Sequence, residues 1–399
     1  MKFSLFLFFP FCVFASTIGY VVQEGTGAVR TFNTQSAFPG VAIPLGATPK
    51  QICLSPDGSC LYAVFPSLDT ILAIDSSTYE TLFEIVVEDP ASIYFSSEGK
   101  GYAVACDALY ALNTQDASLE GPIASFCGYG SRKVVLSPDA RCAYIALTDQ
   151  ICCIDLEAEV ALQLPLEGEF SDLALTPNGS LLCVVYPSSP TLFFVIEVAT
   201  KKILHTISFE EVGKGASAIV TTHDSKTAYL VAEQEDSLLE IDLETGTLQR
   251  VISVGTSPKH AALSPDGATI FVANSSSGDV TPVLVDTGTT LPAIAFGDSC
   301  TAIAVANVDL VQDLQVETIK SRFLVGDAVI NTLSWKSAPG ARTQSFRVWK
   351  NGRFFREVPA QEVMLIEDRR IQSGEQVVYS VVAVSASGTP SRPFAIEVP

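Results

Sequence analysis

Short apolar runs, separated by turn-forming residues, recur along the first three quarters of the chain. Apolar and polar residues alternate within them and no stretch keeps a helical period for long, which favours β-strands. The sequence Leu-Ser-Pro-Asp-Gly or a close variant recurs at 54–58, 136–140, 175–179 and 263–267. Proline presets φ, Asp or Asn can bond its own backbone, and Gly accepts positive φ. Each copy therefore predicts a tight turn between two strands.

The aromatic-led apolar run after each turn divides the chain into repeated units. Seven units start at Tyr20, Tyr62, Tyr102, Tyr144, Cys183, Tyr229 and Phe271, 39 to 46 residues apart. Each unit reads as four short strands, which in the sixth unit we expect at Tyr229–Ala232, Leu238–Asp242, Leu248–Val254 and Lys259–Ser264. Repetition at this period is typical of blade arrays.

The two ends of the array are expected to pair with each other. The array begins with a second strand, Tyr20–Gln23, and ends with a first strand, Thr301–Asn307. Pairing these two strands would complete the first blade and remove an open sheet edge.

Two stretches carry a resemblance to a known repeat. Phe271-Val272-Ala273-Asn274 with the following Ser-Ser-Ser-Gly-Asp-Val, and Val254-Gly255-Thr256-Ser257-Pro258 with the following Leu-Ser-Pro-Asp-Gly, resemble the YVTN-type β-propeller repeat. The resemblance implies an all-β fold with a seven-bladed β-propeller at residues 17–309. The turn motif departs from the pattern where Ala140 replaces Gly, and at 97–100 and 223–226.

The period stops after Asn307, and a different β pattern follows. Leu333-Ser334-Trp335, the run from Phe346 to Gly352 and the run from Tyr379 to Val384 resemble a fibronectin type III domain, an immunoglobulin-like β-sandwich. The resemblance implies such a module at residues 310–399, with Trp335 as a core residue and Asn351-Gly352 as a hairpin turn. Val377 stands where many members have a corner tyrosine, so that hydrogen bond is expected to be missing.

The first residues are typical of a signal peptide. Lys2 precedes an apolar run from Phe3 to Phe14 that ends in small residues, and the run is shorter than a membrane-spanning helix requires. We expect residues 1–16 to be a signal peptide, and the protein to be exported to a periplasmic, cell-surface or secreted location. An uncleaved anchor is the alternative. Nine of the ten cysteines follow this segment, and most lie in apolar runs where Cys can act as a small hydrophobic residue.

Charge is distributed unevenly. Residues 3–316 contain 12 Lys or Arg against 36 Asp or Glu, whereas residues 317–399 contain 11 against 8. Nucleic acid is therefore not an expected partner, because phosphate binding depends on basic charge. The expected partner is a protein or a small anionic ligand, and the sequence does not indicate an oligomeric state.

Few residues suggest catalysis. The chain has three histidines, and it lacks the motifs of phosphate-binding loops, zinc proteases and haem attachment, so we predict no cofactor and no metal. No catalytic residue is assigned. The resemblance places the segments before the innermost strands on one rim of a central channel, where basic residues could attract an anion: Lys50, Arg132, Lys133, Lys214, Lys259 and His260. We expect an exported, non-enzymatic binding or scaffold protein. The alternative is a propeller hydrolase of the lactonase kind, which the repeat pattern also resembles. It needs a general base and a group that binds an oxyanion or phosphate, and His260 with Lys259 comes nearest to this pair.

Overall fold

A computed structural model describes most of the chain from Thr17 onward. The described residues are 17–34, 37–56, 58–76, 78–96, 100–106, 108–114, 118–125, 133–146, 150–158, 160–168, 170–210, 212–307, 311–323, 326–337, 343–351, 353–359, 363–371, 377–385 and 394–398. The expected signal peptide and Arg132 lie outside them. The chain divides into two compact units, one made of Thr17–Ile74 and Thr81–Asn307 and the other containing Val308–Pro399.

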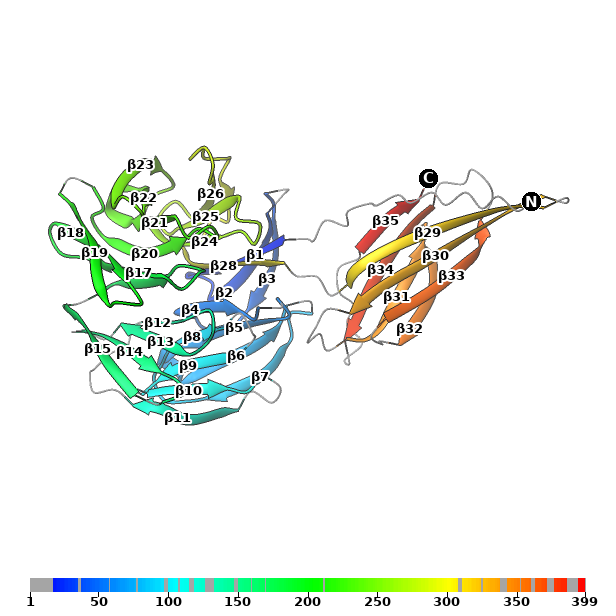
Figure 1. Cartoon of the computed structure of the whole chain (residues 1–399). Coiled ribbons are helices and arrows are strands. Elements are labelled where there is room, and N and C mark those ends of the chain that lie inside the picture. Colours follow the sequence, from blue (N-terminus) through cyan, green and yellow to red (C-terminus); the bar gives the residue numbers. More distant parts are fainter. Residues whose placement is uncertain are drawn as a thin grey trace. The chain divides into compact units, whose positions relative to one another are not determined.

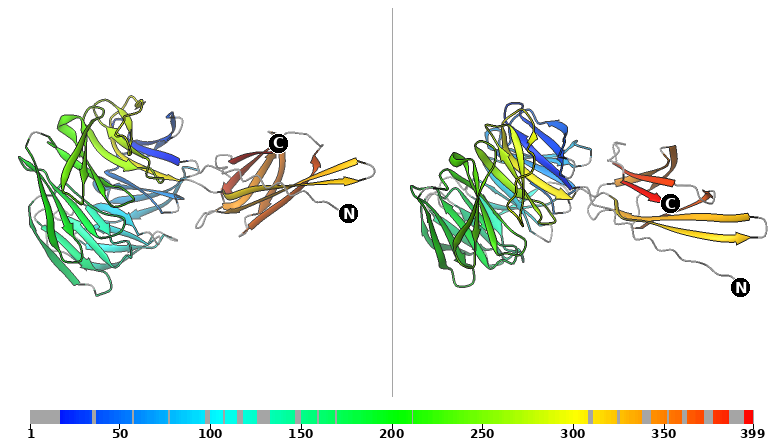
Figure 2. Two further views of the ribbon diagram at one scale, coloured as in Figure 1. Left: turned by 45° about the horizontal axis from the view of Figure 1, so that its top comes forward. Right: turned by 90° about the horizontal axis from the view of Figure 1, so that it is seen from above.

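The first unit contains seven four-stranded sheets, or blades, arranged around a common axis (Figures 1 and 2). From the innermost strand outward, blades 1 to 3 are β28 (Cys300–Asn307), β1 (Thr17–Gln23), β2 (Ala28–Asn33), β3 (Pro39–Pro44); β4 (Gln51–Leu54), β5 (Cys60–Phe65), β6 (Thr70–Asp75), β7 (Thr81–Val86); and β8 (Pro90–Phe95), β9 (Gly101–Ala105), β10 (Ala108–Leu112), β11 (Leu119–Ser125). Blades 4 and 5 are β12 (Lys133–Leu136), β13 (Cys142–Ala146), β14 (Gln150–Asp155), β15 (Val160–Glu167); and β16 (Asp172–Leu175), β17 (Leu181–Tyr186), β18 (Thr191–Glu197), β19 (Lys202–Phe209). Blades 6 and 7 are β20 (Ala216–Thr221), β21 (Thr227–Ala232), β22 (Ser237–Asp242), β23 (Thr247–Ser253); and β24 (Pro258–Leu263), β25 (Thr269–Asn274), β26 (Asp279–Leu284), β27 (Ile294–Ala295). Two 3-10 turns, η1 (Pro66–Leu68) and η2 (Glu233–Glu235), follow the second strands of blades 2 and 6.

The first blade is completed by the last strand of the array, which confirms the predicted closure. Strand β28 pairs antiparallel with β1, with Asn307 opposite Thr17 and Ala304 opposite Tyr20 (Figure 1). Each innermost strand also contacts the innermost strand of the next blade, and β28 contacts both β24 and β4. The seven innermost strands therefore form a closed ring.

The predicted turns lie between the first and second strands of successive blades, and they share one backbone conformation. Gly58, Ala140, Gly179, Ser225 and Gly267 all have positive φ, and each donates its backbone N–H to the carbonyl three residues earlier. The acidic residue of the turn is held locally: Asp266 Oδ1 accepts from Ser264 Oγ at 2.5 Å and from the Ala268 N–H at 3.0 Å. The hydroxyl hydrogen bond lowers the pKa of Asp266. The substitutions at Ala140 and Ser225 therefore leave the turn conformation unchanged.

The core of the first unit lies between blades. One cluster joins blades 5 and 6 through residues such as Phe193, Leu230 and Leu239, which are buried. The adjacent Cys152 and Cys153 belong to two different clusters, on opposite faces of β14. Because successive side chains of a strand alternate between faces, each blade contributes to the core on both sides.

The second unit contains two sheets. Their strands are β29 (Val311–Phe323), β30 (Gly326–Ser337) and β33 (Val363–Ile371) in one, and β32 (Arg353–Pro359), β31 (Thr343–Lys350), β34 (Val377–Ser385) and β35 (Phe394–Val398) in the other. The sheets contact each other through Trp335 and Phe346, whose ring centroids are 5.9 Å apart. Trp335 is 1% exposed, which confirms its predicted core position. Buried Asp368 accepts a hydrogen bond from Tyr379 Oη at 2.6 Å and pairs with Lys350 Nζ at 2.9 Å.

Candidate functional site at the innermost strands

Two of the predicted rim residues lie on exposed segments. Lys50 precedes β4 and Lys214 precedes β20, and both side chains are exposed. The Lys50 backbone N–H donates to the Val64 carbonyl at 2.8 Å, and the Lys214 backbone N–H donates to Glu235 Oε2 at 2.9 Å. These backbone bonds anchor the two segments.

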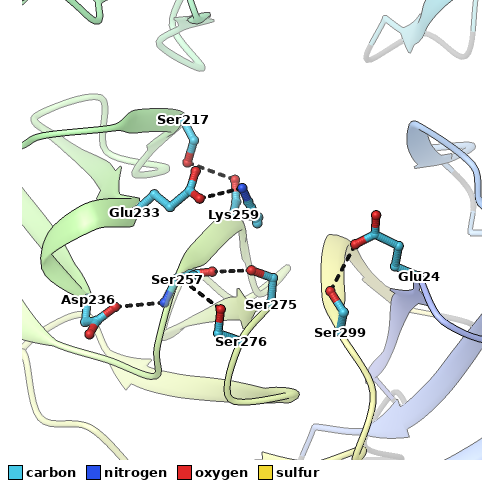
Figure 3. Close-up of polar contacts among 9 residues, drawn as sticks. All are labelled: Glu24, Ser217, Glu233, Asp236, Ser257, Lys259, Ser275, Ser276 and Ser299. Carbon is cyan, nitrogen blue, oxygen red and sulfur yellow. Dashed lines mark hydrogen bonds and ion pairs between the residues drawn. The ribbon is translucent and has the colours of Figure 1, made fainter.

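Lys259 is directed toward the preceding blade. Its Nζ atom forms an ion pair with Glu233 Oε1 at 2.5 Å, and its carbonyl accepts a hydrogen bond from Ser217 Oγ at 3.0 Å (Figure 3). Nearby, Asp236 Oδ1 accepts from the Ser257 N–H at 2.8 Å. The charge of Lys259 is therefore balanced by a carboxylate of blade 6.

Lys133 and His260 occupy the same level of the closed ring. Lys133 is paired with Ala146 on the second strand of its blade, and His260 is paired with Ala273. Ala146 and Ala273 each lie two residues after the aromatic residue at which their unit starts. The equivalent residues of four other blades also lie opposite that second position. We call this set the inner ring: Gln51, Ser92, Lys133, Asp172, Ala218 and His260. Five of its six members are polar. In blade 1 the register of β28 shifts at this level, and no residue is paired with Val22.

An ion pair links two neighbouring members of the inner ring. Lys133 Nζ lies 2.6 Å from Asp172 Oδ1, and the two side chains are 24% and 3% exposed. The other carboxylate oxygen of Asp172 accepts the Ile219 backbone N–H at 2.7 Å. Asp172 therefore joins three consecutive innermost strands, β12, β16 and β20.

Other inner-ring side chains also bond to the next blade. The Gln51 amide donates to the Ile93 carbonyl at 3.2 Å and accepts from the Ile93 N–H at 3.0 Å. His260 forms a hydrogen bond with the backbone of Ile303. Since this bond raises the pKa of His260, the imidazole is the donor and the carbonyl the acceptor.

His260 is neutral near pH 7. Its pKa is lowered to about 4, first by burial and second by the nearby Lys133 ammonium. Its Nδ1 atom is buried and has no hydrogen-bond partner among the described residues. With the other ring nitrogen donating to Ile303, Nδ1 carries a lone pair that can accept a hydrogen bond.

Ser92 is the second inner-ring residue with an unused polar atom. The residue is 2% exposed, and no described residue bonds to its Oγ. It belongs to β8, the neighbour of the strand that carries Lys133. Two residues further along β4 and β8, burial raises the pKa of Cys53 and of Tyr94 to about 12.

The described residues give no support for a metal centre or a membrane-spanning helix. No three His, Cys, Asp or Glu side chains gather in that part of the chain so that they could hold a metal ion. Nor does any helix found there have the length and hydropathy to cross a membrane.

The structure brings together only part of the predicted rim. Lys133 and His260 share the inner ring, Lys259 bonds elsewhere, Lys50 and Lys214 are exposed, and Arg132 is outside the described residues. The sequence analysis missed Gln51, Ser92 and Asp172. Their signal was positional: each lies three residues before the Leu or Phe that ends the innermost strand, as Lys133 and His260 do.

Known proteins share the fold of the first unit. A family model described as "Lactonase, 7-bladed beta-propeller" matches residues 107–294. A functionally unknown protein from Desulfotomaculum acetoxidans has a TM-score of 0.60 at 15% identity, over 73% of this chain and 99% of that chain. Hydrazine synthase of Kuenenia stuttgartiensis has a TM-score of 0.57 at 16% identity, over 70% and 94%, and apo AztD from Citrobacter koseri has 0.58 at 12%, over 73% and 98%. No curated protein matches the chain. At these identities the solved structures indicate fold alone, and together with the seven blades they identify an all-β protein with a β-propeller.

Proposed function

We propose that this is an exported, non-enzymatic binding protein that recognises a small polar ligand with the inner ring of its propeller. The observation that carries the proposal is a pair of buried polar atoms at one level of the ring, Ser92 Oγ and His260 Nδ1, that have no partner among the described residues. A buried polar atom that lacks a partner costs about 1–3 kcal/mol, and most such atoms in native proteins bond to water or a ligand. A ligand that bonds to both atoms would remove this cost.

The electrostatics of the ring bear on the kind of ligand. Lys133 is balanced by Asp172, and His260 is neutral, so the inner ring has no net charge near pH 7. The anion-binding rim stays a prediction. Two of its six residues, Lys133 and Lys259, form ion pairs with acidic side chains. A protein partner on the loops of the same face is the other form of the binding hypothesis, because propeller loops vary while the blades stay rigid.

A ligand-detected NMR screen tests the proposal. A library of small polar metabolites would be screened by saturation transfer against the full chain, its His260→Gln variant and its His205→Gln variant. His205 lies on the outermost strand β19 and bonds to the Glu244 carbonyl, so it is a matched control. We expect hits with the full chain and His205→Gln that disappear with His260→Gln, while the melting temperatures agree. A library without hits, or hits that all survive His260→Gln, would contradict the proposal.

Hydrolysis is the second candidate, and two observations favour it. The matching family model is described as a lactonase, and His260 has the neutral imidazole and open Nδ1 that a general base needs. Assays with a panel of lactones would test it. Turnover that His260→Gln abolishes and His205→Gln preserves would support hydrolysis; no turnover of any lactone would contradict it.

The second unit and the export signal complete the proposal. We propose that residues 310–399 form a fibronectin type III module and that residues 1–16 are removed during export. Limited proteolysis should cut between Asn307 and Thr318 and release two folded pieces, because a sandwich of this size carries its own core. Mass spectrometry of the exported protein would locate its first residue.

A further inference from the structure

The polar atoms of the inner ring are sorted by chemistry. Ser92 and Lys133, on the neighbouring strands β8 and β12, supply a hydroxyl and an ammonium that can donate. Asp172 and His260, on β16 and β24, supply a carboxylate and an unprotonated nitrogen that can accept. Between them, Ala218 on β20 adds no polar side-chain atom. Apart from Gln51, whose amide both donates and accepts, the ring therefore has a donor side and an acceptor side.

Both sides keep unused bonding capacity within the described residues. Among these residues Lys133 Nζ has one partner, Asp172, for its three N–H groups, and Ser92 Oγ has none. Each Asp172 oxygen has one partner and a second lone pair, and His260 Nδ1 has none. Each side can therefore form a further bond without breaking the Lys133–Asp172 pair.

The net charge of the ring selects among ligands. An anion would approach the Asp172 carboxylate as well as Lys133, and a cation would approach Lys133 as well as Asp172. A ligand with charge of one sign is therefore attracted by one of these two groups and repelled by the other. A neutral molecule with separated positive and negative groups matches both sides.

We propose that the inner ring binds a small zwitterion of the free amino acid class. Its carboxylate accepts from Ser92 Oγ and Lys133 Nζ, and its ammonium donates to His260 Nδ1 and the Asp172 carboxylate. This inference rests on the proposed function and specifies its ligand.

Calorimetric titration of the full chain with each of the twenty free amino acids tests the proposal. We expect at least one to bind. Its N-acetyl derivative, which lacks the ammonium, and its amide derivative, which lacks the carboxylate, should each bind at least about tenfold more weakly, the size of a lost charge-assisted hydrogen bond.

Two variants connect each end of the ligand with its side of the ring. Ser92→Ala should weaken the free amino acid severalfold and its amide derivative less, because the amide keeps only a neutral carbonyl acceptor for this hydroxyl. His260→Gln should weaken the free amino acid more than its N-acetyl derivative, whose amide N–H is only a neutral donor. His205→Gln, on the outermost strand β19 and outside the inner ring, is the control and should bind like the wild type.

The outcomes distinguish this inference from the proposed function on which it rests. If library compounds require His260 but no free amino acid binds, or the N-acetyl form binds as tightly as the free one, the zwitterion is wrong and ligand recognition by the ring stands. If no compound of any class depends on His260, both are wrong. Amino acid binding that ignores Ser92→Ala and His260→Gln would place the site elsewhere and overturn the inference.

Discussion

Ala140 has the same left-handed backbone conformation as Gly267 in the equivalent turn, with φ of 53° against 72°. An alanine in this conformation is strained by about 1–2 kcal/mol, whereas glycine is not. Glycine loses about 0.5–1 kcal/mol more backbone entropy on folding. We therefore expect Ala140→Gly to raise the free energy of unfolding by about 0.5–1 kcal/mol, measured by urea denaturation.

Ser225→Gly is the comparison for that substitution. Ser225 has φ of 62°, but its Oγ accepts the Asn178 backbone N–H at 3.1 Å, a bond between the turns of two blades. Glycine relieves the strain and removes this bond, so the two effects should nearly cancel. A gain for Ser225→Gly as large as that for Ala140→Gly would show that strain alone decides.

The Lys133–Asp172 pair predicts a strong coupling between two substitutions. Asp172→Asn keeps an acceptor for the Ile219 N–H but leaves Lys133 without its carboxylate, which should lower stability by about 2 kcal/mol. This is less than for a fully buried pair, because Lys133 is 24% exposed. Adding Lys133→Met should recover much of the loss in a double-mutant cycle. In the more exposed Lys259–Glu233 pair, the corresponding coupling should be below about 1 kcal/mol. Equal couplings in the two pairs would contradict the greater burial of the Lys133–Asp172 pair.

His260 predicts a loss of stability in mild acid. Its pKa is lowered from the ordinary value of 6.5 to about 4 in the folded state, so the unfolded chain binds more protons between these values. This contribution is present above pH 6.5 and is lost as the pH falls toward 4. Between pH 7 and pH 5 the loss should be roughly 1–2 kcal/mol, by linkage, and His260→Gln should abolish it.

NMR titration of the imidazole resonances measures the pKa of His260 independently. The chain has three histidines, so the resonance of His260 can be assigned with His205→Gln and His223→Gln variants. A midpoint near 6.5 for His260 would contradict its burial beside Lys133.

Ring closure predicts that losing one strand unfolds the whole propeller. A chain truncated after Gly297 lacks β28, which opens blade 1 and separates β24 from β4. We expect it to lose cooperative thermal unfolding and to expose apolar surface, whereas a chain truncated after Asn307 should melt cooperatively. Cooperative melting of the shorter chain would show that blades fold independently.

The repeat made most of the fold predictable. Turn residues with a defined backbone preference recur at a nearly fixed spacing, and in the sixth unit the expected strands agree with β21 to β24 within two residues at each end. The pairing of β1 with β28 followed from the phase of the repeat alone. Ala140 and Ser225 were harder to interpret, since the turn conformation there is imposed by the flanking strands and not by glycine.

The candidate site was less predictable than the fold. Lys259 and His260 are adjacent in sequence but point to opposite faces of β24, one toward Glu233 in blade 6 and the other toward Ile303 in β28. The sequence analysis grouped basic residues by the segment that contains them, and so placed residues from both faces of β24 in one set. Asp172 and Ser92 carry no motif, and only the register across seven blades shows that they share a level with Lys133.

The closure also sets the order in which the protein can be completed during synthesis. The Gly25 backbone N–H bonds to Asp298 Oδ1, 273 residues later in the chain. At about 5–20 residues per second, a ribosome needs roughly 14 to 55 seconds to make that interval. Throughout this time β1 has one edge without its native partner, so the nascent propeller stays an open, pliable chain. The ring can close only after residue 307 has emerged, so the first blade to begin is the last to be completed.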